Sequence, residues 1–232
     1  MKNKYQILEK EIGIKIKNRD LFENVFIHRS YLNEHKDLSL ASNEKLEFLG
    51  DSVLSLITSV YLFKNYPSLK EGDYTEIKSA IVKTESLAKA ASDIKLGAYL
   101  YVSKGEEFGG GRENRNILAD CFEALIGCIF LDQSFEKAYL FVCNHLFKKT
   151  LDLIVQDKSY LSSKSLLQEK IQAKYKMTPT YKVLEEKGPE HKRTFTVAVF
   201  FNNKQLGLGI ASSKKEAEEK AAKAAFENPQ LV

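Results

Sequence analysis

The sequence predicts a protein of two domains, an all-α domain followed by a small α+β domain. Two observations lead to this prediction. Up to about residue 155, apolar residues recur three and four positions apart, which is the period of amphipathic helices. After about residue 165, the pattern becomes a short helix, three stretches of alternating apolar and polar residues, and a final helix. We place the first domain at 1–156, a linker at 157–161 and the second domain at 162–232.

The composition is that of an ordinary globular protein. Hydrophobic residues make up 44% and charged residues 28% of the 232 residues. No run of about 18 apolar residues occurs, so we expect no membrane-spanning helix, and the N-terminus lacks the apolar core of a signal peptide. Cys121, Cys128 and Cys143 show no metal-type spacing. Three cysteines in this pattern predict reduced, buried thiols in a cytoplasmic protein.

Helical periodicity in the first domain is clearest in four segments, 44–63, 76–92, 116–131 and 135–155. Residues that favour turns separate them, namely Pro67, Gly72, Gly97, Gly105 and the run Gly109-Gly110-Gly111. The glycine run is not followed by Gly-Lys-Ser/Thr, which excludes a P-loop. We interpret it as a loop that contacts RNA through Arg112 and Arg115.

The segment 43–54, NEKLEFLGDSVL, places three acids on one side of a predicted helix. At 100° per residue, Glu44, Glu47 and Asp51 share an arc of roughly 60°. The opposite side carries the apolar residues that we expect in the core: Leu46, Leu49, Val53, Leu56 and Val60. A solvated acidic edge is the alternative interpretation, but no lysine lies four positions away to relieve Glu47 or Asp51. Phe48 falls beside the acids, which suggests burial against a partner subunit.

The segment 116–132, NILADCFEALIGCIFLD, is nearly all apolar, and Asp120 and Glu123 are its only interior acids. An uncompensated carboxylate in such surroundings costs several kcal/mol. Ala124 and Gly127 lie near the acids and permit the close approach of another backbone. An acidic pair at a solvent edge is the alternative, although the helix is too apolar for a typical surface element.

We expect these two helices to pack together, so that Glu47, Asp51, Asp120 and Glu123 converge. Four close carboxylates repel one another unless a divalent ion lies between them. Oxygen ligands without histidine or cysteine favour Mg²⁺, with Mn²⁺ as a substitute, over Zn²⁺. Such a site suits metal-assisted hydrolysis of a phosphodiester.

The second domain holds the basic excess of the chain. Residues 161–232 carry 13 basic and 8 acidic side chains, against 22 and 23 in the remainder, which suggests an acidic partner. Predicted strands are YKVLEEKG, RTFTVAVFF and KQLGLGIA, with turns at 188–189 and at 202–203. In the last helix, Ser213 and Glu216 predict a capping box. Lys214 and Lys215 in its first turn predict an anion site.

NEKLEFLGDSVL resembles the signature helix of bacterial ribonuclease III, and ILADCFEALIG resembles its second acidic motif. HRSY at 28–31 fits the same family, and the C-terminal module looks like a double-stranded-RNA-binding domain. The resemblance covers nearly the whole chain. Ile27, where a small hydroxyl residue commonly precedes HRS, and Cys121 within the second motif are departures that leave the site acids in place.

The resemblance implies a homodimeric endoribonuclease that cuts double-stranded RNA and leaves 5′-phosphate and 3′-hydroxyl ends with short 3′ overhangs. Precursors of ribosomal RNA and structured messages would be its substrates. It implies catalytic roles for Asp51 and Glu123, metal binding by Glu47, Asp51, Asp120 and Glu123, an auxiliary role for Glu44, and a dimer contact by Phe48. In the second domain, it implies that Lys214 and Lys215 contact phosphates, that Ser165, Gln168 and Glu169 face a minor groove, and that His191 reaches another.

Two other functions stay open at this stage. A non-catalytic protein that binds double-stranded RNA would hold a duplex in Mg²⁺ without cutting it. A helical structural protein whose acids form surface pairs would fold independently of metal and show no affinity for RNA. We expect no membrane partner and no small-molecule cofactor.

Overall fold

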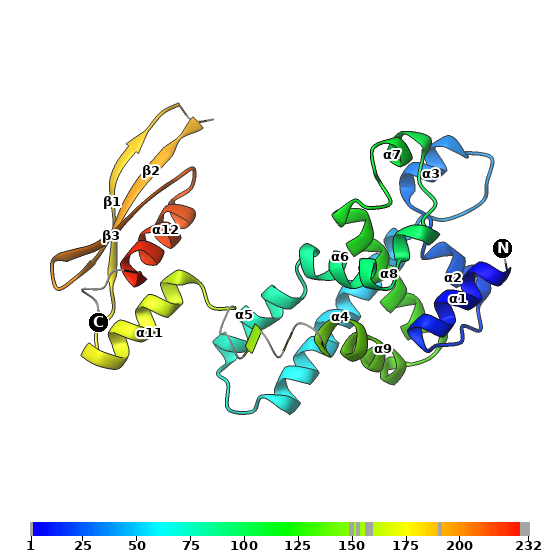
Figure 1. Cartoon of the computed structure of the whole chain (residues 1–232), viewed down its shortest axis with the longest axis horizontal. Coiled ribbons are helices and arrows are strands. Elements are labelled where there is room, and N and C mark those ends of the chain that lie inside the picture. Colours follow the sequence, from blue (N-terminus) through cyan, green and yellow to red (C-terminus); the bar gives the residue numbers. More distant parts are fainter. Residues whose placement is uncertain (1, 149–150, 152–153, 156–159, 190–191, 228–232) are drawn as a thin grey trace. The chain divides into compact units, whose positions relative to one another are not determined.

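The structure, a computed structural model, describes residues 2–148, 151, 154–155, 160–189 and 192–227. The chain divides into two compact units, Met1–Asp157 and Lys158–Val232 (Figure 1). The first unit is helical and the second has the order α-β-β-β-α, which confirms the predicted fold class. Most of the predicted linker, 157–161, lies outside the described residues.

The helices of the first unit differ widely in length, from four residues in a 3₁₀ helix to 22 in α4. In chain order they are α1 (Lys2–Ile12), α2 (Arg19–Asn24), α3 (Arg29–Glu34), α4 (Glu44–Asn65), α5 (Glu71–Ile81), α6 (Thr84–Asp93), a 3₁₀ helix (Leu96–Tyr99), α7 (Lys104–Phe108), α8 (Arg115–Asp132), α9 (Phe135–Val142) and a π-helical turn (Cys143–Phe147).

Three helix limits differ from the predicted ones. The predicted helix 76–92 is divided between α5 and α6, because Lys83 is extended and acts as the N-cap residue of α6. Apolar residues are buried in both helices, Ile77 and Ile81 in α5 and Leu87 in α6, so the helical period of the sequence continues across the break. Gly72 lies in the first turn of α5 rather than between helices. The predicted helix 135–155 changes from α to π geometry at Cys143.

Helices α4 and α8 pack along each other at the centre of the first unit. Two glycines allow this close approach. A Cβ atom at Gly50 would lie 1.8 Å from the carbonyl oxygen of Glu123, and one at Gly127 would lie 2.4 Å from that of Leu46. The predicted role of Gly127 is therefore confirmed, because any larger side chain at either position would push the two backbones apart.

The buried side of α4 differs in part from the predicted stripe. Leu46 and Val53 are buried as expected, but Leu56 is 55% exposed. The predicted core stripe lies directly opposite the acids. Helix α8 instead packs against the side of α4 that carries Gly50, so the buried face of α4 is turned away from Leu56. By length and composition alone α4 would be able to cross a membrane, but it is packed along α8 with Leu54 fully buried in the core.

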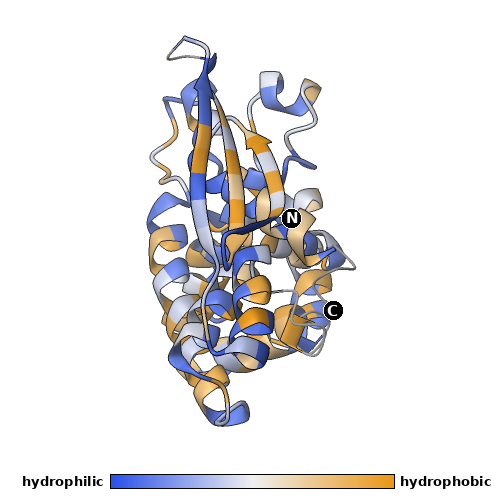
Figure 2. Ribbon diagram, turned by 90° about the vertical axis from the view of Figure 1, so that its left-hand side faces the viewer, coloured by the Kyte–Doolittle hydropathy of each residue, from blue (hydrophilic) through white to orange (hydrophobic). Residues whose placement is uncertain are grey.

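The second unit is an antiparallel sheet with two helices on one face. Its elements are α11 (Ser163–Tyr175), β1 (Thr180–Lys187), β2 (Thr194–Phe201), β3 (Lys204–Ala211) and α12 (Lys214–Phe226), with strand order β1-β2-β3. Hydrophobic and hydrophilic residues alternate along the strands (Figure 2). Asn202 and Asn203 have φ values of 47° and 62°, as a tight turn between antiparallel strands requires. The core includes Leu167, Val199 and Ala221.

Candidate active site

Three of the predicted acids meet where α4 and α8 pack. Glu47 on α4 and Asp120 and Glu123 on α8 each offer a carboxylate oxygen, and these oxygens lie within 4.8 Å of one another. All three side chains are half-buried. The two glycine contacts hold the helices close enough for acids from different helices to share one site.

The pKa values of these carboxyl groups show that the cluster is electrostatically unfavourable without a cation. Burial raises the pKa of Glu123 to about 8, and the negative charges of Asp51, Glu47 and Asp120 add to the effect. Burial also raises the pKa of Glu47, with Asp120 as the largest contributing charge. The pKa of Asp120 is raised by burial despite the opposing effect of two nearby basic side chains. Carboxylate oxygens of this kind suit a hard divalent metal ion, which would neutralise the repulsion.

The other two predicted acids flank this group of three. Asp51 is exposed and does not belong to the group, although its charge raises the pKa of Glu123. Glu44 is also exposed; it accepts a hydrogen bond from Ser42 Oγ at 2.7 Å and lies 3.7 Å from Arg29 Nη1. The catalytic role of Asp51 and the auxiliary role of Glu44 stay predictions.

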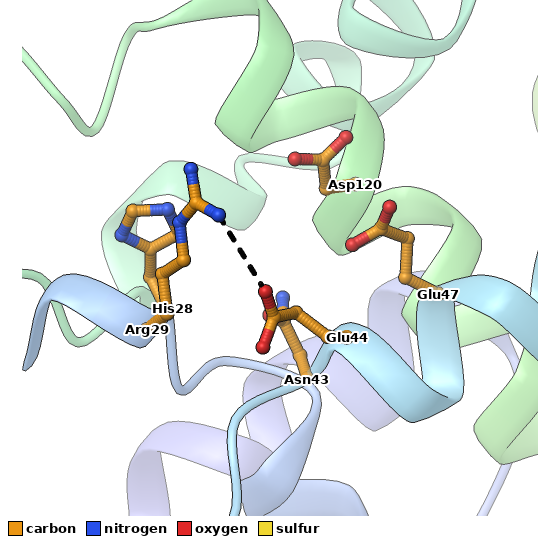
Figure 3. A pocket seen from close by; sticks show the side chains of 6 residues that line it. All are labelled: His28, Arg29, Asn43, Glu44, Glu47 and Asp120. Carbon is orange, nitrogen blue, oxygen red and sulfur yellow. Dashed lines mark ion pairs between the residues drawn. The ribbon is translucent and has the colours of Figure 1, made fainter. Parts of the chain in front are cut away.

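A cavity of about 260 Å³ lies beside the cluster (Figure 3). It is lined by His28, Arg29, Asn43, Glu44, Glu47 and Asp120. His28 and Arg29 belong to the HRSY motif, which marked the family in the sequence but gave no indication that these side chains would face the acids.

The apolar residue predicted to contact a partner subunit is on the surface of the first unit. Phe48 is 79% exposed, and Phe63, farther along α4, is 73% exposed. Together with the exposed Leu56 they give α4 an apolar outer face, here defined by Phe48, Leu56 and Phe63. The dimer contact of Phe48 itself stays a prediction.

The glycine-rich loop is held by an arginine that was expected to bind RNA. Arg112 donates hydrogen bonds to the carbonyl oxygens of Gly97 at 3.2 Å and Leu100 at 2.6 Å. It also forms an ion pair with Glu107 at 2.6 Å. Its Nε and Nη1 atoms therefore bind groups of the protein itself, and the contact of Arg112 with RNA stays a prediction.

The start of α12 presents the two predicted lysines. Lys214 and Lys215 are exposed in its first turn, and Ser213 Oγ accepts a hydrogen bond from the N–H of Glu216 at 3.2 Å. The reciprocal half of the predicted capping box is not formed. The Glu216 carboxylate instead bonds Ser212 Oγ at 3.4 Å and Lys220 at 3.0 Å, because the adjacent hydroxyl and the lysine one turn later compete for it.

The residues predicted to face the minor groove lie at the start of α11. Gln168 and Glu169 are exposed, whereas Ser165 is half-buried. The N–H of Ser165 donates to Ser162 Oγ at 3.1 Å, so Ser165 belongs to the helix cap. His191 lies outside the described residues.

A helical unit with a half-buried cluster of carboxylates that could hold a metal ion, joined to a basic α-β-β-β-α unit, defines a metal-dependent nuclease that acts on double-stranded RNA. Residues 18–150 match the family model described as Ribonuclease-III-like, and residues 163–228 match the model described as double-stranded RNA binding motif. The chain belongs to the ribonuclease III family.

Similar proteins extend over both units. Ribonuclease 3 of Treponema denticola is 42% identical over 229 residues, which cover 98% of this chain and 92% of that protein. Ribonuclease 3 of Geobacillus thermodenitrificans is 42% identical over 227 residues, covering 97% and 90%. The solved nuclease domain of ribonuclease III from Campylobacter jejuni matches with a TM-score of 0.57 and 35% identity, covering 62% of this chain and 96% of that one. That structure is described as flexible in a region involved in dimer formation.

Proposed function

We propose that this member of the ribonuclease III family cleaves double-stranded RNA with Mg²⁺, leaving 5′-phosphate and 3′-hydroxyl ends with short 3′ overhangs. The observation that carries the proposal is the convergence of Glu47, Asp120 and Glu123 from two helices. Its substrates would be precursors of ribosomal RNA and structured RNAs in the cytoplasm. Mn²⁺ would substitute for Mg²⁺, because both ions prefer oxygen ligands.

In this proposal Glu47, Asp120 and Glu123 hold the ion, and Asp51 adds a fourth carboxylate from the exposed side. When bound, Mg²⁺ would lower the pKa of water and neutralise negative charge on the phosphate. Asp51 and Glu123 would be the catalytic acids. The raised pKa of Glu123 in the metal-free protein means that the ion must displace a proton from it near neutral pH.

Double-stranded RNA would be held by the second unit through its shape. Lys214 and Lys215 would contact phosphates across a groove, since both are exposed at the N-terminus of α12. Gln168 and Glu169, with Ser165 beside them, would face one minor groove, and His191 would reach another.

The active form would be a homodimer. The exposed apolar face of α4, defined by Phe48, Leu56 and Phe63, supports this part of the proposal, because large contiguous apolar patches on a monomer usually mark an interaction site. Phe48 would insert into the partner subunit. One active site in each subunit would then cut one strand of the duplex.

The test is a cleavage assay on a labelled RNA duplex and its single-stranded control, each with Mg²⁺ and with Ca²⁺. We expect cleavage of the duplex alone, and with Mg²⁺ alone, to products that carry a 5′-phosphate. Tight binding of the duplex without cleavage in Mg²⁺ or Mn²⁺ would refute the proposal and support the non-catalytic alternative.

A further inference from the structure

The cavity beside the metal-binding carboxylates has one acidic and one basic wall. Glu44, Glu47 and Asp120 form the acidic side, and His28 and Arg29 lie across from them (Figure 3). The guanidinium group of Arg29 points into the cavity between these two sides. A substrate phosphate that reaches the cluster would therefore have the basic wall on its other side.

The guanidinium group of Arg29 is only partly used within the protein. Its Nη1 lies 3.7 Å from Glu44 Oε1, which is longer than a hydrogen bond. This is the only ion pair of Arg29 within the part of the chain that the structure describes. A guanidinium group carries five N–H donors, so donors remain for a ligand in the cavity.

The backbone around Arg29 is held by hydrogen bonds within its own segment and to the segment 101–103. The N–H of His28 donates to the carbonyl oxygen of Tyr101 at 3.1 Å. The N–H of Ser30 donates to His28 Nδ1 at 3.3 Å, which caps the start of α3. Ser30 Oγ in turn accepts a hydrogen bond from the N–H of Ser103 at 3.0 Å. The residues on both sides of Arg29 are thus fixed, and its side chain starts from a defined position.

A second set of hydrogen bonds joins this segment to the start of α4. Asn43 is 2% exposed; its N–H donates to the carbonyl oxygen of Ile27 at 2.9 Å, and its Nδ2 donates to that of Val25 at 3.2 Å. Because Asn43 directly precedes Glu44 and stands one turn before Glu47, these bonds hold the acids and Arg29 at opposite sides of one cavity.

The ion pair with Glu44 does not account for this arrangement. Both side chains are largely exposed, at 73% for Arg29 and 54% for Glu44, and exposed ion pairs contribute little to stability. A scissile phosphodiester shares one negative charge between its two non-bridging oxygens, and attack by a deprotonated water adds a second. If the metal held by Glu47, Asp120 and Glu123 lies against one of these oxygens, a second cation is needed to offset the charge that develops on the other, and Arg29 is the guanidinium group that lines the cavity.

We propose that Arg29 is a further catalytic residue, which binds a non-bridging oxygen of the scissile phosphate through its guanidinium group. This inference rests on the proposed nuclease function. Charge-assisted hydrogen bonds from arginine to phosphate are short and directional, and donors already placed where negative charge develops lower the barrier to reaction. A lysine at this position would keep the charge but lose the forked geometry.

The test compares Arg29→Gln and Arg29→Lys with Arg19→Gln. Arg19 is a control for the loss of an arginine in another part of the same unit, where it pairs with Glu9 at 2.9 Å. Because Glu9 is buried, the fold of this variant is verified by circular dichroism before its rate is compared. In single-turnover cleavage with Mg²⁺, Arg29→Gln should lose roughly 10²-fold in rate, as for other preorganised donors. Arg29→Lys should recover part of the loss, and Arg19→Gln should cleave like the wild type.

A second readout does not depend on cleavage. Duplex affinity is measured in Ca²⁺ at several salt concentrations, and the slope of log K against log[salt] should decrease in magnitude by roughly 0.9 for each Arg29 that contacts the duplex. A third measurement uses a duplex in which sulfur replaces the non-bridging oxygen of the scissile phosphate that faces Arg29. The wild type should cleave this duplex more slowly than the ordinary one, whereas Arg29→Gln should cleave both at the same rate.

An unchanged salt slope in Arg29→Gln, together with an equal loss of rate in Glu44→Gln, would overturn the inference and show that Arg29 only holds Glu44. Absence of cleavage by the wild-type protein would instead overturn the nuclease function on which the inference rests. The two failures are therefore distinguishable.

Discussion

Replacing Glu123 with glutamine should stabilise the metal-free protein, and the gain should grow as the pH rises. Burial and neighbouring charges raise the pKa of Glu123 from 4.5 to about 8. Between these values the folded protein keeps a proton that the unfolded chain releases. The free energy of unfolding of the wild type therefore falls as the pH rises through this window and stays lowered above it. Glutamine has nearly the same shape and cannot ionise.

The magnitude follows from the size of the shift. One pKa unit corresponds to about 1.36 kcal/mol, so the full shift of Glu123 would amount to about 5 kcal/mol. The side chain is only half-buried, and screening by solvent reduces this to about 2–3 kcal/mol. Glu47 and Asp120, whose pKa values are raised as well, leave a residual dependence on pH in the variant.

The assay is urea unfolding in EDTA at pH 5 and pH 8.5, at one fixed protein concentration because the proposed dimer would also contribute to stability. Glu123→Gln should match the wild type within about 1 kcal/mol at pH 5 and exceed it by about 2–3 kcal/mol at pH 8.5. Glu11→Gln, an exposed change on α1, serves as the control and should follow the wild type. A pH dependence in Glu123→Gln equal to that of the wild type would refute the assignment of the buried charge.

Three further changes probe the packing, the dimer and the RNA interface. Gly127→Ala should lower the free energy of unfolding by at least about 1–3 kcal/mol in a urea titration, because its Cβ would meet the backbone of α4. Gly72→Ala is the control and should not lower it, since its Cβ meets nothing within 4 Å. Equal stability of the two variants would contradict the close approach of α4 and α8. Phe48→Ala should raise the dimer dissociation constant by at least roughly tenfold in sedimentation, a loss typical of an aromatic anchor. Phe108→Ala, at a 95% exposed position on α7, is the matched control. A dimer dissociation constant of Phe48→Ala equal to that of the wild type would refute the proposed contact. Lys215→Gln should weaken duplex binding on all sequences alike and reduce the salt slope by about 1, so a sequence-dependent loss would argue against a phosphate contact.

Much of the fold could be predicted because local patterns and tertiary packing agree. The apolar run of α8 predicted a buried helix, and its residues from Ile117 to Ile129 are buried apart from the two acids. In the second unit, alternation of apolar and polar residues predicted three strands, which the structure contains. Asn202 and Asn203 predicted a turn, since asparagine tolerates positive φ better than most residues.

The differences arise where a neighbouring element decides the outcome. Leu56 has the spacing of a core residue, but the side on which α8 packs leaves it exposed. Glu216 has the spacing of a capping box, but Lys220 and Ser212 bind its carboxylate.

The sequence predicted the acids of the candidate site, but it did not predict that His28 and Arg29 line the cavity beside them. Spacing on two helices indicated which carboxylates share a face, and Glu47, Asp120 and Glu123 do meet. The position of Arg29 depends on hydrogen bonds through Asn43 and Ser30 to distant segments. Such contacts leave no periodic signal, so the basic wall of the cavity becomes visible only in the structure.

Metal binding by the RNA-free protein tests most directly whether the carboxylates of α4 and α8 hold a divalent ion. Mn²⁺ is titrated into the wild type and into the double variant Asp120→Asn, Glu123→Gln, and free Mn²⁺ is followed by electron paramagnetic resonance. The wild type should bind Mn²⁺, and the double variant should bind it at least about 10-fold more weakly. The double variant should also cut no duplex, while its affinity for the duplex in Ca²⁺ stays near that of the wild type. Equal Mn²⁺ binding by the two proteins would contradict the account, because the ion would then lie elsewhere.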